Sequence, residues 1–339
     1  MRRIWERNHG YTILRPYVDL CTRLSYRKFR IEGKLPANGA VLIAPNHTNT
    51  LMDALVVLRT RHRATVFGAR ADIFEQKTVA SILRFLRILP MVRRRDGIRN
   101  VLRNYEIFDE VDEVLAHDVP FCMFAEGRHR PMHSLLPIGK GIARIAFASA
   151  SERPTVIVPT GIDYTDFFHY RGDVVIRFGQ ALDVNAFLAE HAEDGEAVQY
   201  QTFRDELFKR ISGLITYVPD DEHYEERWNA IEAERKRGRL PKWLRMVIAV
   251  LKAPFFALSS LLTLPMWSFG EFLCHRKVKD PAFRNSVRFG IRLLLTPIML
   301  IVWGLVFGLT LPWWAALGIC LYFLLSYSIF YDWLNLIRD

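Results

Sequence analysis

Between residues 30 and 219, short apolar runs alternate with longer stretches in which apolar residues recur at helical spacing. The short runs predict strands at 40–44, 65–68, 88–92, 120–125, 155–160 and 173–178. The longer stretches predict helices at 51–58, 74–86, 98–117, 141–149 and 197–217. Such alternation indicates an α/β domain whose mixed sheet is flanked by helices.

The chain begins with a polar, basic segment that continues into a predicted amphipathic helix ending at Phe29. Its apolar residues recur at helical spacing and include Ile13, Tyr17 and Leu24, whereas arginine and lysine supply the other side. We expect residues 1–29 to form an N-terminal helix that packs on the domain or lies in a membrane interface. The first ten residues lack the apolar core of a secretion signal, so export is not expected.

The C-terminal part of the chain has a different pattern. No charged residue occurs from 293 through 331, and this run is long enough for two membrane crossings of about 18–20 residues each. Aromatic residues gather near both ends of the two segments, as in interfacial belts, and a proline at 312 marks the turn. We therefore expect a transmembrane hairpin at 293–331.

A second apolar stretch, residues 246–274, is interrupted by Pro254 and Pro265 and has basic segments on both sides. Basic loops prefer the cytoplasmic side, so we expect this stretch to form a re-entrant or interfacial helical hairpin. A single tilted span is the alternative. Together with the hairpin at 293–331 it makes up a membrane region at 246–339, and the charged residues 220–245 form a linker to it. An even number of crossings then leaves the α/β domain (30–219) and the C-terminus both in the cytoplasm.

Composition narrows the classes of partner. Half of the 339 residues are hydrophobic and 24% are charged, which excludes a mainly disordered chain. The net charge of +10 indicates an anionic partner: nucleic acid, anionic lipid or a phosphorylated substrate. No basic stretch is interleaved with aromatic residues as in a nucleic-acid-binding module, so lipid and phosphate remain. The four cysteines lack metal-ligand spacing, and neither a disulfide framework nor a metal site is expected.

The strongest chemical signal lies where the strand at 40–44 leads into the helix at 51–58. His47 occupies the connecting loop, and Asp53 follows about a turn and a half later. An aspartate at this spacing can bind one imidazole nitrogen and leave the other to accept a proton. Backbone amides at the start of the helix are candidates for binding an oxyanion. The spacing alone is also compatible with a capping histidine and a surface aspartate, and no GxSxG nucleophile elbow points to a hydrolase.

Three further blocks each contain a predicted strand. ILPMVRRRDG at 88–97 is a strand that ends in three arginines, and FAEGRHR at 124–130 is a strand that ends in Glu-Gly and then basic residues. VIVPTGIDY at 156–164 is a strand interrupted by a proline. In this order, after PNHTNTLMD at 45–53, they resemble the blocks of the glycerolipid acyltransferase family, the PlsC-like domain. The resemblance covers roughly residues 30–164 and implies a glycerol-3-phosphate acyltransferase-like α/β fold.

The resemblance implies roles for individual residues. His47 is then the general base and Asp53 orients it, while Arg93, Glu126, Gly127 and Arg128 bind the phosphorylated acceptor. Arginine binds phosphate bidentately and stays charged, so Arg130 is a further candidate for this site. Two departures concern the acceptor more than the reaction: five residues rather than four separate His47 from Asp53, and an alanine at 125 replaces the usual proline.

The resemblance predicts a membrane-bound O-acyltransferase of phospholipid biosynthesis that acylates 1-acyl-sn-glycerol-3-phosphate. Acyl-CoA or acyl carrier protein supplies the thioester as co-substrate, and no other cofactor is expected. The expected partners are the phospholipid bilayer, the phosphorylated glycerol acceptor and the acyl donor, without nucleic acid. Glycerol-3-phosphate, dihydroxyacetone phosphate and an amino-acid lipid are alternative acceptors. A non-catalytic membrane scaffold is the alternative from another class, and it would be insensitive to replacement of His47.

Overall fold

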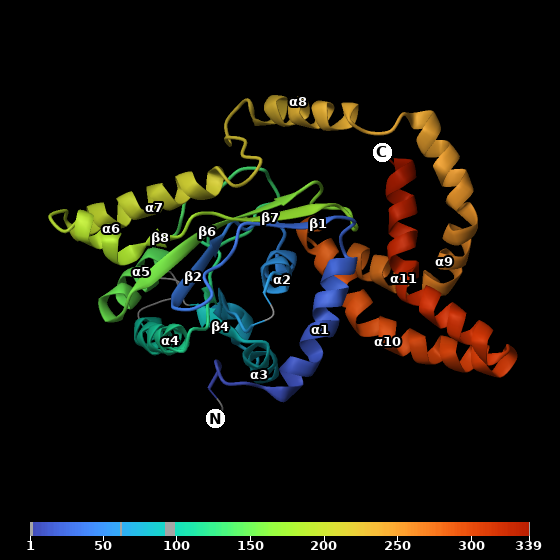
Figure 1. Ribbon diagram of the computed structural model, residues 1–339, viewed down its shortest axis with the longest axis horizontal. Helices are drawn as coiled ribbons and strands as arrows, with labels where there is room; N and C mark the ends of the chain where they lie inside the picture. Colours follow the sequence, from blue (N-terminus) through green and yellow to red (C-terminus); the bar gives the residue numbers. More distant parts are fainter. Residues whose placement is uncertain (1–2, 62, 92–98, 339) are drawn as a thin grey trace.

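The computed structural model describes residues 3–61, 63–91 and 99–338 (Figure 1). Within them the strands are β1 (Phe29–Glu32), β2 (Ala40–Pro45), β3 (Val66–Arg70), β4 (Ile88–Met91), β5 (Phe121–Cys122), β6 (Thr155–Tyr164), β7 (Val174–Phe178) and β8 (Leu182–Asp183). The helices of the N-terminal half are α1 (His9–Leu24), α2 (Leu51–Arg59), η1 (Ala71–Phe74), α3 (Lys77–Phe85), α4 (Arg99–Ala116) and α5 (Lys140–Glu152). The later helices are α6 (Val184–Glu190), α7 (Glu196–Ser212), α8 (Tyr224–Arg237), α9 (Lys242–Arg276), η3 (Pro281–Phe283), α10 (Arg284–Thr310) and α11 (Trp313–Arg338).

The strands of the described residues form one mixed sheet in the order β1-β7-β6-β2-β5-β3-β4, with β8 beside β6. The central strand β2 pairs in parallel with β5 on one side and with β6 on the other. The sheet is mixed because β7 runs antiparallel to β6 while pairing in parallel with β1. This arrangement confirms the predicted α/β class with a mixed sheet between helices.

Two apolar cores lie on the two faces of the sheet, and β2 contributes to both because successive side chains of a strand alternate. Ala40, Leu42 and Ala44 join the core that contains residues of α4, α5, α6 and α7. Val41 and Ile43 join the other, which contains residues of α1, α2, α9, α10 and α11. All six residues of β2 are buried, as expected for a strand covered on both faces.

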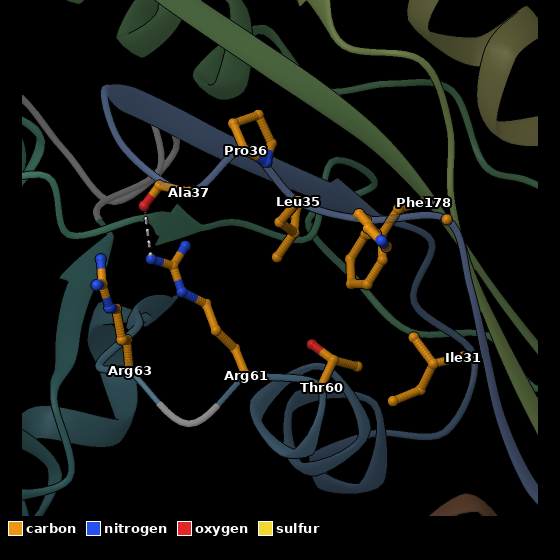
Figure 2. Close-up of a pocket in the computed structure, with 10 residues that line it drawn as sticks. Ile31, Leu35, Pro36, Ala37, Thr60, Arg61, Arg63 and Phe178 are labelled. Carbon is orange, nitrogen blue, oxygen red and sulfur yellow. Dashed lines mark hydrogen bonds between the residues drawn. The ribbon is translucent and has the colours of Figure 1, made fainter.

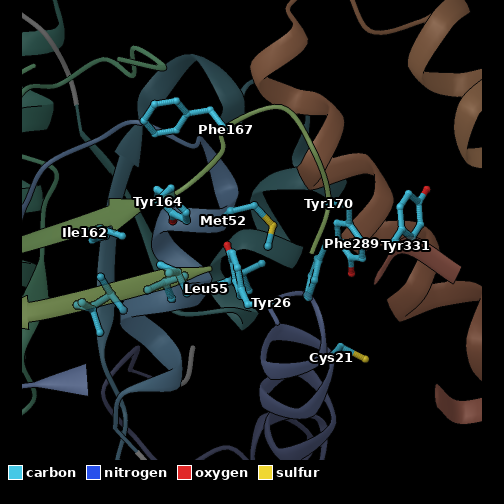
Figure 3. Close-up of a cluster of buried hydrophobic side chains, with 14 of the residues drawn as sticks. Cys21, Tyr26, Met52, Leu55, Ile162, Tyr164, Phe167, Tyr170, Phe289 and Tyr331 are labelled. Atoms are coloured by element: carbon cyan, nitrogen blue, oxygen red, sulfur yellow. The ribbon is translucent and has the colours of Figure 1, made fainter. Parts of the chain in front are cut away.

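The second core is continuous from the sheet to the C-terminal helices. Figure 3 shows Ile162 and Tyr164 of β6, Met52 of α2, and Phe289 and Tyr331 of α10 and α11 within one cluster of buried side chains. The α/β part and the apolar helices therefore share a core and are not separated by a solvated linker on this side.

The N-terminal helix ends earlier than expected. α1 stops at Leu24, and the chain then pairs with β7, so the prediction of helix as far as Phe29 is wrong. The pairing joins segments about 145 positions apart, which local periodicity does not reveal. On one side α1 packs on the domain, where the buried Arg15 donates hydrogen bonds to the carbonyl oxygens of Leu58 and Arg61. On its other side Ile13 is 80% exposed.

The expected helical hairpin at 246–274 is also wrong. α9 runs without interruption from Lys242 to Arg276 and contains both Pro254 and Pro265. Contacts with a neighbouring helix stabilise α9: the ring of Phe256 stacks on the ring of Trp333 of α11, with the ring centroids 3.9 Å apart. Packing of this kind offsets the hydrogen bond that each proline removes.

Three helices within the described residues are long and apolar enough to cross a membrane. They are α9, the stretch Pro281–Thr310 that contains α10, and α11. The chain turns between Thr310 and Trp313, where the sequence places the turn. A continuous α9 adds a third candidate span, so the even number of crossings expected from the sequence does not follow from the structure.

Candidate active site

The loops that carry the candidate residues meet at one edge of the sheet. β2, β5 and β6 run in parallel, so their carboxyl ends lie side by side, which is the usual location of ligand sites in α/β sheets. His47 follows β2, Glu126 follows β5, and Tyr164 is the last residue of β6. The side chain of Asn46 extends the β2–β6 pairing, since its Nδ2 donates to the Ile162 carbonyl at 3.0 Å and its Oδ1 accepts from the Ile162 N–H at 2.6 Å.

The structure brings His47 and Asp53 together. His47 Nδ1 lies 2.7 Å from Asp53 Oδ2, and the same oxygen accepts the backbone N–H groups of Thr48 at 2.9 Å and Asn49 at 2.7 Å. Asp53 is completely buried on the first turn of α2. The carboxylate therefore shapes the loop and orients the imidazole at once. It also occupies the N–H groups of Thr48 and Asn49, which are not free to bind an oxyanion.

Tyr164 completes the environment of Asp53, a role that the sequence analysis did not predict. Its hydroxyl donates to Asp53 Oδ1 at 2.7 Å. Burial, and then the charge of Asp53, raise the pKa of Tyr164 well above its ordinary value, so the phenol remains a neutral donor. The one feature of the sequence that could have indicated this role is the position of Tyr164 at the end of a predicted strand, β6, which lies next to β2.

The second imidazole nitrogen of His47 remains accessible. The ring stacks on Phe124, with centroids 4.1 Å apart, and 18% of the side chain is exposed. Among the described residues, no hydrogen bond reaches Nε2 of His47. With Nδ1–H donating to Asp53, Nε2 carries the lone pair that can accept a proton.

Glu126 links two loops of the site. Its Oε1 accepts the His47 N–H at 2.7 Å and its Oε2 accepts the Leu136 N–H at 2.9 Å. Burial raises the pKa of this carboxyl to about 7, although the two N–H groups oppose the shift. In this structure Glu126 thus holds the backbone of His47, and both of its oxygens are occupied.

Gly127, Arg128 and Arg130 follow Glu126 in the sequence, and the structure places them in different surroundings. Gly127 has φ +67°, a left-handed conformation that favours glycine. Arg128 is exposed and makes no ion pair with the described residues. Arg130, in contrast, is paired with Asp220 and donates to Ser134 Oγ at 2.6 Å. Arg93, the remaining predicted acceptor ligand, lies outside the described residues.

A cleft of about 420 Å³ lies away from this site (Figure 2). It is lined by Leu35 in the loop between β1 and β2, by Arg61 and Arg63 after α2, and by Phe178 at the end of β7. The residues after α2 and the end of the β1–β2 loop lie where β2 begins, whereas His47 follows the end of β2 and does not line the cleft. Chemistry, rather than cavity size, therefore identifies the candidate site. Within the part of the chain that the structure describes, no group of three or more His, Cys, Asp or Glu side chains could hold a metal ion.

The fold and the site define an α/β protein with a buried His–Asp pair at the carboxyl edge of a mixed sheet. Residues 27–163 match the model of the family described as Acyltransferase. The matched region coincides with the α/β part of the chain that carries the His47–Asp53 pair, and it bears out the resemblance to an acyltransferase domain. No curated protein matches the chain.

One similar solved structure is the crystal structure of the 1-acyl-sn-glycerophosphate acyltransferase PlsC from Thermotoga maritima. It is 17% identical in sequence, with a TM-score of 0.44, and the match covers 62% of this chain and 83% of that one.

Proposed function

We propose that this chain is a membrane-bound O-acyltransferase of phospholipid biosynthesis that transfers a fatty acyl chain from a thioester to 1-acyl-sn-glycerol-3-phosphate. The observation that carries the proposal is the His47–Asp53 pair, with Nε2 of His47 accessible, inside an Acyltransferase-family domain. The long apolar helices α9, α10 and α11 support a membrane location for an enzyme whose substrates and product are lipids.

The reaction follows from the orientation of the imidazole. Nε2 of His47 removes the proton of the acceptor hydroxyl as its oxygen attacks the thioester carbonyl. The new C–O bond forms and the C–S bond breaks, and the proton passes from His47 to the departing thiolate. Asp53 keeps Nδ1 protonated throughout and stabilises the transient imidazolium. The donor, acyl-CoA or acyl carrier protein, is a co-substrate and no other cofactor takes part.

The acceptor phosphate requires cationic donors near His47. Arg128 fits this role because it is exposed and directly follows the Glu126–Gly127 turn, and Arg93 is the second candidate. Arg130 fits it less well, because Asp220 and Ser134 already engage its guanidinium. We place the catalytic domain on the cytoplasmic side, since basic segments flank the apolar helices.

The test is an assay of the purified full-length chain in lipid, with a labelled acyl thioester. Glycerol-3-phosphate, its 1-acyl ester and a lyso-amino-acid lipid are offered in parallel, and we expect the 1-acyl ester to be the best acceptor. His47→Ala should lower kcat by about 10²–10⁴-fold, the usual contribution of a general base. Preference for another acceptor would replace the substrate in this proposal, and wild-type activity of His47→Ala would refute the mechanism.

A matched control is available in the α6–α7 region. His191 Nδ1 lies 2.7 Å from Asp194 Oδ2, the same distance as in the His47–Asp53 pair. The pair lies in the connection between α6 and α7, and Figure 1 shows these helices on the side of the molecule opposite the C-terminal helices. His191→Gln should leave kcat unchanged. A comparable loss in this variant would show that the assay reports general damage and not removal of a base.

A further inference from the structure

The connection between α9 and α10 lies against the candidate active site. We call residues 277–286 the α9–α10 wall. Asp280 Oδ2 is 3.1 Å from His129 Nε2, and the ring of Phe283 packs edge-on against His129 at 5.2 Å. Ser286 Oγ is 2.8 Å from Oγ1 of Thr50, the residue before α2. The wall lies outside the region 27–163 that matches the family model, and it belongs to the C-terminal part of this chain.

His129 is a second imidazole beside the first. Its ring lies 5.7 Å from the ring of His47 at an angle of 74°, and 25% of its side chain is exposed. Its Nε2–H donates to Asp280, and no hydrogen bond from the described residues reaches Nδ1. His47 uses the opposite nitrogen for its carboxylate. The two rings therefore present different nitrogens, Nε2 of His47 and Nδ1 of His129, to a ligand.

The surroundings of Asp280 favour its ionised form. Its Oδ1 accepts the Ala282 N–H at 2.9 Å and so caps η3, while Oδ2 faces His129. Burial alone would raise the pKa of Asp280, but the Ala282 N–H and His129 outweigh it and lower the pKa below its ordinary value. A charged carboxylate behind His129 fixes the ring and favours two charge-assisted hydrogen bonds, one from each nitrogen of the imidazolium.

We propose that the α9–α10 wall forms one side of the acceptor site, and that Asp280 is a positioning residue that holds His129 so that its Nδ1–H binds the phosphate of the acceptor. The proposal rests on the proposed acyltransferase function and names a binding group for its phosphorylated substrate. Arg128, the neighbour of His129 in the sequence, binds the same anion from the domain side. Part of the acceptor site thus belongs to the apolar C-terminal region.

The first experiment separates acceptor binding from chemistry. Asp280→Asn keeps a side-chain oxygen to cap η3 but removes the charge that faces His129. We expect it to raise the KM for 1-acyl-sn-glycerol-3-phosphate about tenfold, the usual scale for one hydrogen bond to a charged group, without a comparable change in kcat or in the donor KM. His129→Gln should reproduce the effect, the double variant should be no worse than either single one, and Asp280→Glu should recover part of the affinity.

Asp194→Asn is the matched control, because it breaks the remote His191–Asp194 pair and should change neither KM. An unchanged acceptor KM in Asp280→Asn, or an equal rise of donor and acceptor KM, would overturn the positioning role. A wild-type chain that acylates none of the acceptors refutes the proposed function itself.

The second experiment tests the wall without any need for activity. Thr50→Cys combined with Ser286→Cys places two thiols where the hydroxyl oxygens lie 2.8 Å apart, within reach of a disulfide. Mild oxidation of the full chain in lipid should link the two positions. Thr50→Cys alone should form no internal link, because the native Cys21, Cys122 and Cys274 are buried, and Cys320 lies near the α10–α11 turn, at the opposite end of α10 from Ser286. Failure of the double variant to cross-link would show that the wall does not lie on the site.

Discussion

Replacing Asp53 by asparagine separates the two tasks of this carboxylate, which are to shape the loop and to supply charge. Asp53 accepts four hydrogen bonds: from His47 Nδ1, the Thr48 and Asn49 N–H groups, and the Tyr164 hydroxyl. An amide oxygen placed at the Oδ2 position keeps the first three. The amide nitrogen then faces the tyrosine oxygen, which can turn to accept. Asp53→Asn therefore preserves the loop while it removes the negative charge next to the imidazole.

The two effects differ in magnitude. A hydrogen bond to a charged group contributes about 1.5–3 kcal/mol and a neutral one about 0.5–1.5 kcal/mol, so Asp53→Asn should cost about 1–2 kcal/mol of stability. The imidazolium formed during the reaction loses its counter-charge, and we expect kcat to fall about 10²–10³-fold. Asp53→Ala leaves several buried donors without a partner and should cost about 3–5 kcal/mol, enough to disorder the loop.

The assay is steady-state kinetics on purified chain, combined with thermal unfolding of the same samples. Asp163→Asn is the control, because the Asp163 side chain is only 9% exposed and also faces a histidine, with 3.5 Å between Asp163 Oδ1 and His133 Nδ1. It lies next to Tyr164 on β6 and faces the other side of the sheet. It should lower the unfolding temperature and leave kcat nearly unchanged. Near-wild-type kcat in Asp53→Asn, with His47→Ala inactive, would refute the orienting role of Asp53.

Two further predictions concern the Glu126–Arg128 turn. Arg128→Ala should raise the acceptor KM about tenfold and leave the donor KM unchanged, since an exposed arginine near the site loses only its phosphate contact; titrating both substrates checks this. Glu126→Gln should remove a pH dependence of stability. Because burial raises the pKa of Glu126 from 4.5 to about 7, the unfolded chain loses this proton first, and the free energy of unfolding falls as pH rises across that window. Thermal unfolding from about pH 5 to pH 8 should show a smaller fall in the variant, and an identical fall would contradict the assignment.

The sequence predicted what depends on neighbours along the chain. The His47–Asp53 contact joins residues six positions apart across one loop and one helical turn, so their spacing alone brings them within reach. The alternation of strands and helices, and the uncharged run at 293–331, are likewise local patterns set by backbone geometry and by the burial of apolar side chains.

Other features depend on residues far apart in sequence, and the patterns missed or misplaced them. β1 exists because it pairs with β7, and α9 continues through two prolines because it packs on α11. Arg130 donates a hydrogen bond to Asp220, which lies 90 positions away in the sequence. The position of Arg130 in the sequence had instead indicated a phosphate ligand.

The amino-acid sequence by itself therefore determined the fold class, the two membrane-length segments of 293–331 and the pair of residues proposed for the chemistry. Only the tertiary structure decided what surrounds that pair. Tyr164 reaches Asp53 because β6 lies beside β2, and Asp280 reaches His129 because the α9–α10 wall folds back over the domain. The reason is physical: hydrogen bonds and packing depend on distance in space, and distance along the chain predicts that only within a few residues.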